Sequence, residues 1–326
     1  MKRTGIPTRI IPIATIALIM VLLAGCATLP DIEGLVSAET FHTPDSRFIE
    51  IDGISMHYQS SGTETAGTPL VMLHGFMSNI NSWNYITPVL AERRPVYAYD
   101  RMAFGLTERI ERDEFPAGES PYTTEAVRVR AEKLLDAWGL EKSVLVGNSA
   151  GGNLAVQLAL AAPERVAALI LIDPAVYRNG PPAIVRTLLK LPFLENFGLR
   201  TTRNLVADSE ELFASAWYNL DAIPAEIRQW YEYPLQIQNW DRALWEYTRA
   251  NSDPGIVNRL DGIGVPVLII HGRHDEIVPL EQSLRLVDDI PGAELYIVEE
   301  CGHVPQEECP AETAAVIGDF LARHDL

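Results

Sequence analysis

Cysteine and basic residues are both scarce in this chain of 326 residues. It has three cysteines, and its 26 Lys and Arg residues stand against 44 Asp and Glu, a formal net charge of −18. So few cysteines exclude a small domain built on several disulfides, and a chain this long buries enough surface to fold without a disulfide or a metal. The acidic balance argues against nucleic-acid binding and against electrostatic attachment to anionic lipid, because both need a basic surface.

The N-terminus has one largely apolar run, Ile10–Ala24, and this run is short. Its 15 residues suit the core of a signal peptide. They fall short of the roughly 20 residues that span a bilayer. Basic residues precede the run, and it ends in Leu23-Ala24-Gly25-Cys26. We therefore expect residues 1–25 to be a signal peptide.

Cys26 and the residues before it resemble the lipobox of bacterial lipoproteins, in which the chain is cut before the Cys and the Cys is acylated. The resemblance implies that Cys26 is lipidated and that the exported protein is anchored to a membrane of the cell envelope by its acyl chains. Residue 27 is Ala rather than Asp, which favours the outer membrane where two membranes are present. An ordinary cleaved signal followed by a chance Cys is the alternative.

Residues 26–46 contain Pro30, Gly34 and Pro44 and show no hydrophobic periodicity. We expect this segment to be a flexible tether with a reach of roughly 25 Å. The folded domain would then lie close to its membrane.

From residue 47 onward, short apolar runs alternate with amphipathic stretches. Phe48–Ile51 and Ile54–Tyr58, joined by Asp52-Gly53, indicate a β-hairpin. The later runs are almost wholly apolar, as strands buried on both faces are. These runs are Leu70–Leu73, Val96–Tyr99, Val144–Val146, Ala168–Ile172, Val265–Ile270 and Leu295–Val298, with helices expected at Glu125–Trp138, Ala150–Ala161, Leu280–Val287 and Pro310–Ala322. The alternation predicts an α/β fold with a mostly parallel central sheet and helices on both faces.

One interval is much longer than a crossover between neighbouring strands requires. About 90 residues separate Asp173 from Val265, where a few residues and one helix would suffice. Four of the six Trp residues of the chain lie there. We predict a mostly helical cap at residues 174–255, inserted into a core domain formed by residues 47–173 and 256–326. Most of the cap aromatics would form the core of the cap, and a few would face a pocket.

The strongest chemical signal is Gly147-Asn148-Ser149-Ala150-Gly151, which follows an apolar strand and opens an apolar helix. A strand, a sharp turn and a helix form the setting of a nucleophile elbow. Such a turn needs Gly on both sides of the Ser, and it leaves the hydroxyl exposed at the helix N-terminus, where negative charge is stabilised. Because a free Ser is a weak nucleophile, Ser149 needs a base that is itself held in place.

Asp275 and His303 are the candidate partners of Ser149. Each follows one of the last two predicted strands, and parallel α/β sheets place their sites at that edge. The order Ser149, Asp275, His303 is that of the α/β hydrolases. With the matching segments Leu73–Phe76, Asp100–Gly105, Gly147–Gly152, Gly272–Pro279 and Gly302–Glu307, the chain from about residue 47 to its end resembles a capped α/β-hydrolase fold protein.

The resemblance implies a role for each residue. Ser149 would attack an acyl carbon, His303 would transfer the proton, and Asp275 would orient the imidazole and stabilise its charged form. The backbone N–H groups of Phe76 and Ala150 would form the oxyanion hole.

Other residues compete for these roles. Asp173 also follows a strand, where some family members keep the catalytic acid. His274 is a near neighbour of Asp275, and His74 belongs to the His-Gly motif and is expected to be structural. A degenerate, non-catalytic member of the fold is a further alternative, although all three triad positions are filled.

Cys301 and Cys309 flank His303 and remain once Cys26 is acylated. In an exported protein they could close a disulfide around the loop of the base, with two free, partly buried thiols as the alternative. No HExxH motif or paired CxxC motif occurs, so we expect no metal and no cofactor.

The nucleophile separates this chain from haloalkane dehalogenases and epoxide hydrolases, which use an Asp at the position of Ser149. Carboxylesterases, lipases, perhydrolases and carbon–carbon bond hydrolases all keep a Ser there, and the stretch Gly147–Gly152 is similar to that of the last group. An exported enzyme would meet compounds that arrive from outside the cell. We therefore expect a carboxylic ester hydrolase for small-molecule esters of apolar acyl or alkyl groups. The alternatives are a carbon–carbon hydrolase or perhydrolase of the same fold and a non-catalytic ligand-binding envelope lipoprotein.

Overall fold

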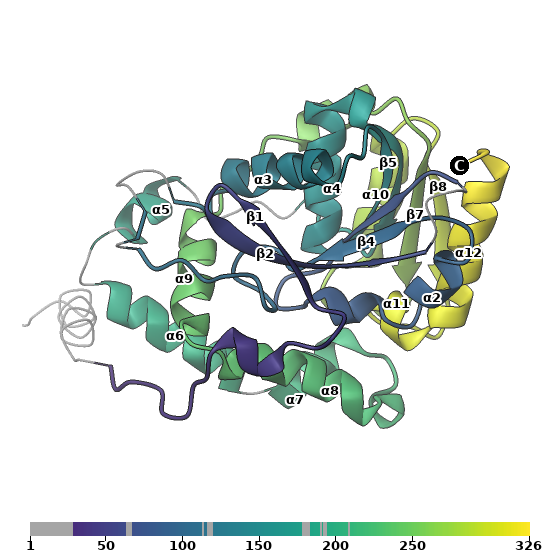
Figure 1. Ribbon diagram of the computed structural model, residues 1–326. Helices are drawn as coiled ribbons and strands as arrows, with labels where there is room; N and C mark the ends of the chain where they lie inside the picture. Colours follow the sequence, from purple (N-terminus) through teal and green to yellow (C-terminus); the bar gives the residue numbers. More distant parts are fainter. Residues whose placement is uncertain are drawn as a thin grey trace, which may run out of the picture.

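The computed structural model describes residues 29–326 apart from 63–66, 113, 116–119, 178–182, 190, 192–193 and 208 (Figure 1). The predicted signal peptide and Cys26 lie outside the described residues. No helix within the described part of the chain combines the length and the apolar character that crossing a bilayer requires.

Eight strands form one sheet in the order β1-β2-β4-β3-β5-β6-β7-β8. β1 (Arg47–Ile51) and β2 (Ile54–Ser61) form the predicted antiparallel hairpin, and both turn residues, Asp52 and Gly53, have positive φ. β2 also pairs antiparallel with β4, whereas β4, β3, β5, β6, β7 and β8 run parallel. Their bounds are Leu70–Leu73 for β3, Val96–Tyr99 for β4, Ser143–Asn148 for β5, Val166–Ile172 for β6, Val267–Gly272 for β7 and Glu294–Val298 for β8.

Every predicted strand is present, with ends that differ by up to three residues from the prediction, and one of the shifts is at the start of β7. That strand begins at Val267, two residues after the predicted start at Val265. Pro266 has no N–H group to donate to the sheet, although its carbonyl accepts a hydrogen bond from Leu169 N at 2.9 Å. A proline before a central strand therefore delays the pairing.

Alternate residues of the strands face two separate cores, one on each side of the sheet. Val71 and Leu73 of β3 pack toward α3 (Thr124–Ala137), α4 (Ala150–Ala161) and α10 (Leu280–Asp289). Leu70 and Met72 face η2 (Ile80–Trp83), α2 (Thr87–Leu90) and α12 (Pro310–Arg323). Figure 1 shows these helices covering the two faces. The apolar runs are continuous because both faces of each central strand are buried.

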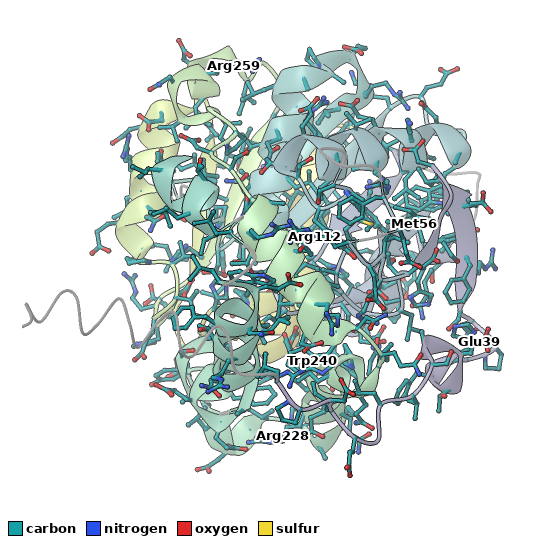
Figure 2. All side chains as sticks on the ribbon, turned by 90° about the vertical axis from the view of Figure 1, so that its left-hand side faces the viewer. Glu39, Met56, Arg112, Arg228, Trp240 and Arg259 are labelled. Atoms are coloured by element: carbon teal, nitrogen blue, oxygen red, sulfur yellow. The ribbon has the colours of Figure 1, made fainter. Side chains whose placement is uncertain are left out.

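The long insert between β6 and β7 contains the helices of the cap. They are α5 (Ala183–Leu189), α6 (Glu195–Ala207), α7 (Ser209–Ala216), α8 (Ala225–Glu232) and α9 (Trp240–Ala250), with the 3-10 turns η5 (Leu220–Ala222) and η6 (Tyr233–Gln236), and η7 (Val257–Gly262) leads back to the core. Figure 2 views this side, with Trp240 near the middle and Arg228 of α8 at the lower edge.

The cap aromatics divide between two places. Phe213 and Trp217 form a small core of their own with Ile227 and with Val304 of the main domain. Trp240 and Tyr247, both on α9, join the core on the α3–α4 side of the sheet. The cap is therefore packed onto the main domain through the loop that carries His303 and through α9.

Residues 29–46 do not hang free as a flexible tether would. Val36 N donates to Gln236 O at 2.9 Å, Val36 O accepts from Gln238 N at 2.9 Å, and the carbonyl of Pro30 accepts from Arg203 Nη1 at 2.7 Å. Ile32 and Leu35 also pack against the core on the α3–α4 side. The described part of the predicted tether is thus docked on the protein, with its few apolar residues partly buried.

Candidate active site

Ser149 lies at the sharp turn between β5 and α4. Its φ of 53° and ψ of −116° are strained for a residue with a side chain, and its N–H donates to Ile172 O at 2.9 Å. A Cβ on Gly147 would lie 2.5 Å from Gly151 O, and one on Gly151 would fall on the backbone of Leu73. The glycines are therefore required by close strand–helix packing, as an elbow demands.

His303 and Asp275 form a hydrogen-bonded pair. Asp275 follows β7, and His303 lies between β8 and α11 (Pro305–Glu308); His303 Nδ1 is 2.7 Å from Asp275 Oδ2. The other oxygen of Asp275 accepts from the N–H groups of Ile277 at 2.7 Å and Val278 at 2.9 Å. Burial raises the pKa of Asp275, but the hydrogen bond and charge of His303 and the Val278 N–H outweigh burial, so the pKa lies below its usual value. Asp275 is thus an ionised partner that holds the imidazole.

Asn148 connects the elbow to the His303 loop. Its Nδ2 donates to His303 O at 3.1 Å and to Ile172 O at 3.2 Å. From the cap, Ala216 O accepts the N–H of His303 at 2.7 Å. Among the described residues no hydrogen bond joins Ser149 Oγ to His303. Such contacts are often long in unliganded enzymes and tighten when substrate binds.

Phe76 and Ala150, the residues predicted for the oxyanion hole, flank Ser149. Ala150 is the first residue of α4, so its N–H has no acceptor within the helix. Phe76 follows Gly75, on which a Cβ would lie 3.5 Å from Ser149 Cβ. Gly75 O accepts from His74 Nδ1 at 2.8 Å and from Arg101 Nη2 at 2.9 Å, which fixes the loop.

His74 is bonded within the protein. Its Nε2 accepts the N–H of Arg101 at 2.9 Å, so its proton is on Nδ1. Burial, followed by the charge of Arg101, lowers the pKa of His74 to about 3, and the ring stays neutral. His274, the other neighbouring histidine, stacks on Tyr218 with ring centroids 4.2 Å apart and does not bond Asp275.

Asp173, the alternative acid, lies beside the pair instead of bonding His303. Gly272 N donates to Asp173 Oδ1 at 2.9 Å, and His271 Nδ1 lies 3.3 Å from the same oxygen. Burial raises the pKa of Asp173 well above its usual value, and the charge of Asp275 raises it further. Asp173 is therefore held protonated while Asp275 carries the charge.

His271 is a buried residue of this region that the motifs did not single out. It shares a hydrogen bond of 2.7 Å with Ser283 Oγ, and burial lowers its pKa to about 4. In the described part of the chain, the group of Asp173, Asp275 and His303 brings three metal-ligand atoms within 4.8 Å of one another. The 2.7 Å bond between His303 and Asp275 already commits two of these residues to each other.

Cys301 and Cys309 are free thiols in the structure. Hydrogen-bond contact with Cys309 and burial raise the pKa of the Cys301 thiol. The Cys309 thiol also contacts Glu300 O at 3.6 Å. Of the two states that the sequence left open, the structure therefore has the unbridged one.

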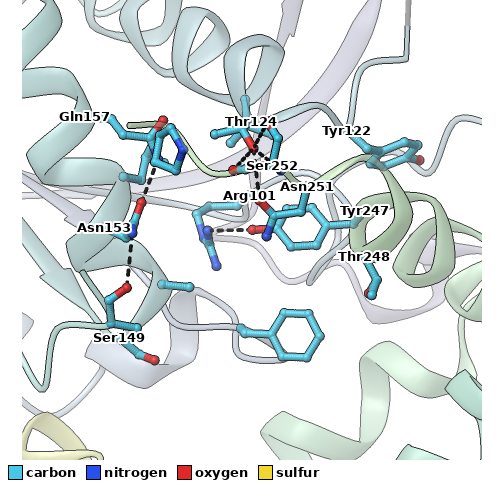
Figure 3. A pocket seen from close by; sticks show the side chains of 16 residues that line it. Arg101, Tyr122, Thr124, Ser149, Asn153, Gln157, Tyr247, Thr248, Asn251 and Ser252 are labelled. Carbon is cyan, nitrogen blue, oxygen red and sulfur yellow. Dashed lines mark hydrogen bonds between the residues drawn. The ribbon is translucent and has the colours of Figure 1, made fainter. Parts of the chain in front are cut away.

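Ser149 opens onto a cavity of about 280 Å³ between the main domain and the cap (Figure 3). Apolar side chains from the loops and helices form part of its wall, including Phe76, Val127 and Leu154. Polar side chains also line it, including Thr124, Asn153, Gln157, Asn251, Ser252 and the buried Arg101. The site therefore suits a small molecule with both apolar and polar parts.

Sequence reasoning missed Arg101 and Tyr247 as cavity residues. Arg101 lies in the segment Asp100–Gly105, which matched the family without suggesting a role for it. Its position directly after an apolar strand was the available signal. Tyr247 lies on α9 of the cap, where spacing along the sequence does not indicate which face meets the cavity.

Glu307, on α11 just after His303, is fully buried between the main domain and the cap. It accepts hydrogen bonds from Ser82 Oγ and, at 2.7 Å, from Tyr231 OH. Burial raises its pKa from 4.5 to about 7, and these two hydrogen bonds only partly oppose that rise. Glu307 therefore binds a proton in the folded chain at a pH where the unfolded chain has released it.

We expect Glu307→Gln to flatten the pH dependence of stability. Between pH 4.5 and about 7 the folded wild type holds a proton that the unfolded chain lacks, so its stability falls as pH rises through this window. The neutral amide keeps both acceptor contacts and has no such loss, so at pH 8 the variant should gain up to about 3 kcal/mol over wild type. Urea unfolding of both proteins at pH 4.5 and pH 8 measures this, and parallel profiles would contradict it.

The comparison with known proteins now identifies the fold. A family model described as the alpha/beta hydrolase fold matches residues 68–310. The chain belongs to this family of hydrolases. As an α/β hydrolase, it combines the parallel sheet, the elbow Ser and the acid–base pair on consecutive loops.

Curated relatives share most of the length of this α/β hydrolase. The chain is 33% identical over 290 residues to 2-hydroxymuconate semialdehyde hydrolase of Pseudomonas sp. (strain CF600), covering 84% of this chain and 92% of the relative. It is 30% identical over 289 residues to 2-hydroxy-6-oxo-2,4-heptadienoate hydrolase of Pseudomonas putida, covering 86% and 97%. The crystal structure of a bacterial membrane phospholipase A superposes with a TM-score of 0.68 at 23% identity, covering 96% and 91%. That last likeness shows the fold alone.

Proposed function

We propose that this α/β hydrolase cleaves a carbon–carbon bond beside a carbonyl group in a small oxo-acid. Ser149 would be the nucleophile, His303 the acid–base group and Asp275 its orienting partner. The observation that carries the proposal is that Ser149, in its strained elbow, opens onto a cavity, while Asn148 beside it is hydrogen-bonded to the loop of the His303–Asp275 pair. The relatives that are 33% and 30% identical supply the bond type, since their names denote hydrolases of oxo-dienoate acids. This choice differs from the expected ester hydrolase.

The reaction would follow from the positions of these groups. His303 takes the proton of Ser149 as Oγ adds to the carbonyl carbon, and the N–H groups of Phe76 and Ala150 bind the oxyanion. The carbon–carbon bond then breaks, its electron pair goes to the departing carbon, and His303 returns the proton to that carbon. Water, deprotonated by His303, hydrolyses the acyl-Ser149 ester and frees the enzyme.

Two substrates that offer different bonds to the enzyme test the bond type. We expect purified protein to turn over 2-hydroxymuconate semialdehyde, measured as the loss of its dienol absorbance. The kcat/KM of this reaction should be at least about tenfold above that for p-nitrophenyl butyrate. Ser149→Ala is the blank for both reactions. Rapid turnover of the ester with no turnover of the dienol acid would reject carbon–carbon cleavage.

Ester hydrolysis is the second candidate, and the sequence observation that favours it is the lipobox-like ending at Cys26. An enzyme outside the cytoplasm would meet esters arriving from the surroundings. The same Ser149, His303 and oxyanion donors serve ester cleavage, in which the departing oxygen takes the proton. The paired assay therefore separates the two bond types without changing the assignment of the site.

We also propose that the protein is exported and anchored to the cell envelope through an acyl group on Cys26. Arg203 of α6 binds the carbonyl of Pro30, four residues after Cys26. Exposed apolar side chains occur on two cap helices, at Ile184 and Leu188 of α5 and Leu205 of α6, and Figure 1 shows both helices at the left. This arrangement would turn α5 and α6 toward the membrane. Intact mass of the protein purified from membranes tests the acylation, and an unmodified Cys26 would contradict it.

A further inference from the structure

Arg101 is a buried cation in the wall of the cavity that contains Ser149. Its side chain follows β4, is 1% exposed and extends toward the centre of the cavity in Figure 3. Nη2 donates to Gly75 O at 2.9 Å, Nη1 lies 3.4 Å from Tyr247 OH, and Nε has no partner. The guanidinium also lies over the ring of Phe104, 5.3 Å from its centroid. All of these contacts are to neutral groups.

No carboxylate compensates this charge in the described part of the chain. The ion pairs there do not include Arg101, whereas Arg203 and Arg249 of the cap are paired with Asp241 and Glu246. The carboxylate of Asp100, the adjacent residue, is hydrogen-bonded on both oxygens. Oδ2 lies 2.7 Å from His57 Nδ1 and accepts from Leu106 N at 2.8 Å, and Oδ1 accepts from Ile80 N at 2.8 Å. The carboxylate nearest along the chain is therefore engaged elsewhere.

An uncompensated buried cation is costly, because the protein interior replaces its hydration poorly. A ligand anion in the cavity would supply the missing charge, and a guanidinium matches a carboxylate in shape and donors. Among the described residues that line the cavity, none is an Asp or a Glu that would repel such an anion. The remaining wall offers amides, hydroxyls and apolar groups, which can hold the uncharged part of the same molecule.

We propose that Arg101 binds a carboxylate of the substrate and makes the enzyme selective for acyl compounds that carry a negative charge. The inference deepens the proposed function and rests on it, since it requires Ser149 to attack another part of the same molecule. It holds equally for carbon–carbon and for ester cleavage, and it assigns to the cavity a specificity for the acid over its neutral counterpart.

Binding to inactive protein tests the site apart from catalysis. Ser149→Ala should bind monomethyl adipate, measured by calorimetry, and should bind uncharged dimethyl adipate much more weakly. Adding Arg101→Gln should weaken binding of the acid by about 100-fold, because a buried charge pair is lost. Arg101→Lys should restore part of that affinity. Equal binding of the two compounds, or unchanged binding of the acid after Arg101→Gln, would overturn the proposal.

Kinetics on a matched pair of esters distinguishes charge recognition from support of the Gly75 loop. The pair is p-nitrophenyl hydrogen adipate and its methyl ester, which differ by one negative charge and one methyl group. We expect wild type to favour the acid, and the kcat/KM ratio of acid to neutral ester to fall about 100-fold in Arg101→Gln. If Arg101 only positioned Gly75, the variant would slow both esters by the same factor and the ratio would not change.

Arg130→Gln is the matched control. Arg130 is another buried Arg, on α3, whose Nη1 donates to Pro121 O at 3.2 Å, and it does not line this cavity. The control should keep the wild-type ratio of acid to neutral ester. Arg101-dependent binding of the acid with no turnover of either ester or of 2-hydroxymuconate semialdehyde would uphold the carboxylate site and reject the proposed function. Turnover of 2-hydroxymuconate semialdehyde, with both esters cleaved without preference, would uphold the proposed function and reject the carboxylate site.

Discussion

Ser149→Ala is expected to lower kcat by roughly five to six orders of magnitude, the largest effect of any single change in this chain. The variant loses the hydroxyl of Ser149, which lines the cavity, and water cannot take the place of an oxygen held in a strained, preorganised turn. Single-turnover and steady-state rates on the preferred substrate measure the loss. Intact mass after treatment with a fluorophosphonate gives an independent readout, with one adduct on wild type and none on the variant.

Changes at the partners of Ser149 should show that the three residues act as one unit. His303→Ala should cost about as much as Ser149→Ala, and the double variant should cost little more than either. Asp275→Asn should cost about 10⁴-fold, because the amide favours the wrong imidazole tautomer. Ser215→Ala, a Ser of the cap whose hydroxyl donates to Leu212 O, is the control and should keep wild-type activity. An adduct of equal mass on Ser149→Ala would place the nucleophile elsewhere.

Gly151→Ala should destabilise the fold by at least about 3 kcal/mol or prevent folding. The new Cβ would fall on the carbonyl oxygen of Leu73 and lie 2.6 Å from Leu73 C and 2.7 Å from His74 O. All of these atoms belong to the backbone at the end of β3, which runs directly into the oxyanion loop. They cannot move away without shifting Phe76, so any folded variant should also lose activity. Guanidinium unfolding followed by fluorescence measures the stability.

Gly318→Ala, also in a helix, should have the opposite effect on stability. Gly318 lies inside α12, and a Cβ there would meet nothing within 4 Å. Alanine should therefore stabilise the protein by about 0.5–1 kcal/mol through the lower entropy of the unfolded chain. A Gly151→Ala protein as stable as wild type would show that α4 does not pack on β3 as described.

The strands and the elbow could be predicted because their signals are local. Continuous apolar runs such as Val71–Leu73 and Val144–Val146 indicate strands that are buried on both faces, and Asp52-Gly53 indicates the turn of a hairpin. The glycines around Ser149 indicate a turn in which side chains at the neighbouring positions would have no room. Each signal depends on backbone geometry within a few residues, which the sequence specifies directly. The start of β7 moved by two residues because one proline lacks a donor.

The partner of His303 was decided by tertiary structure. Asp173 and Asp275 both follow β-strands, so the sequence offered two acids for one base. Folding buries both acids and places Asp275 Oδ2 2.7 Å from His303 Nδ1. The charge on Asp275 helps to keep Asp173 protonated. Two carboxyl groups in one buried place cannot both ionise at little cost, so the geometry selects which of them carries the charge.

The sequence alone thus determined the sheet, the helices that cover it, the cap insert and the Ser–Asp–His order, since each depends on local pattern or on chain order. Only the tertiary structure decided that residues 29–46 dock on the cap, that Cys301 and Cys309 are unbridged and that Arg101 faces the cavity. These features depend on which surfaces meet after folding. Contacts between distant segments depend on packing and on the compensation of buried charge. Neither leaves a periodic pattern in the sequence from which it could be predicted.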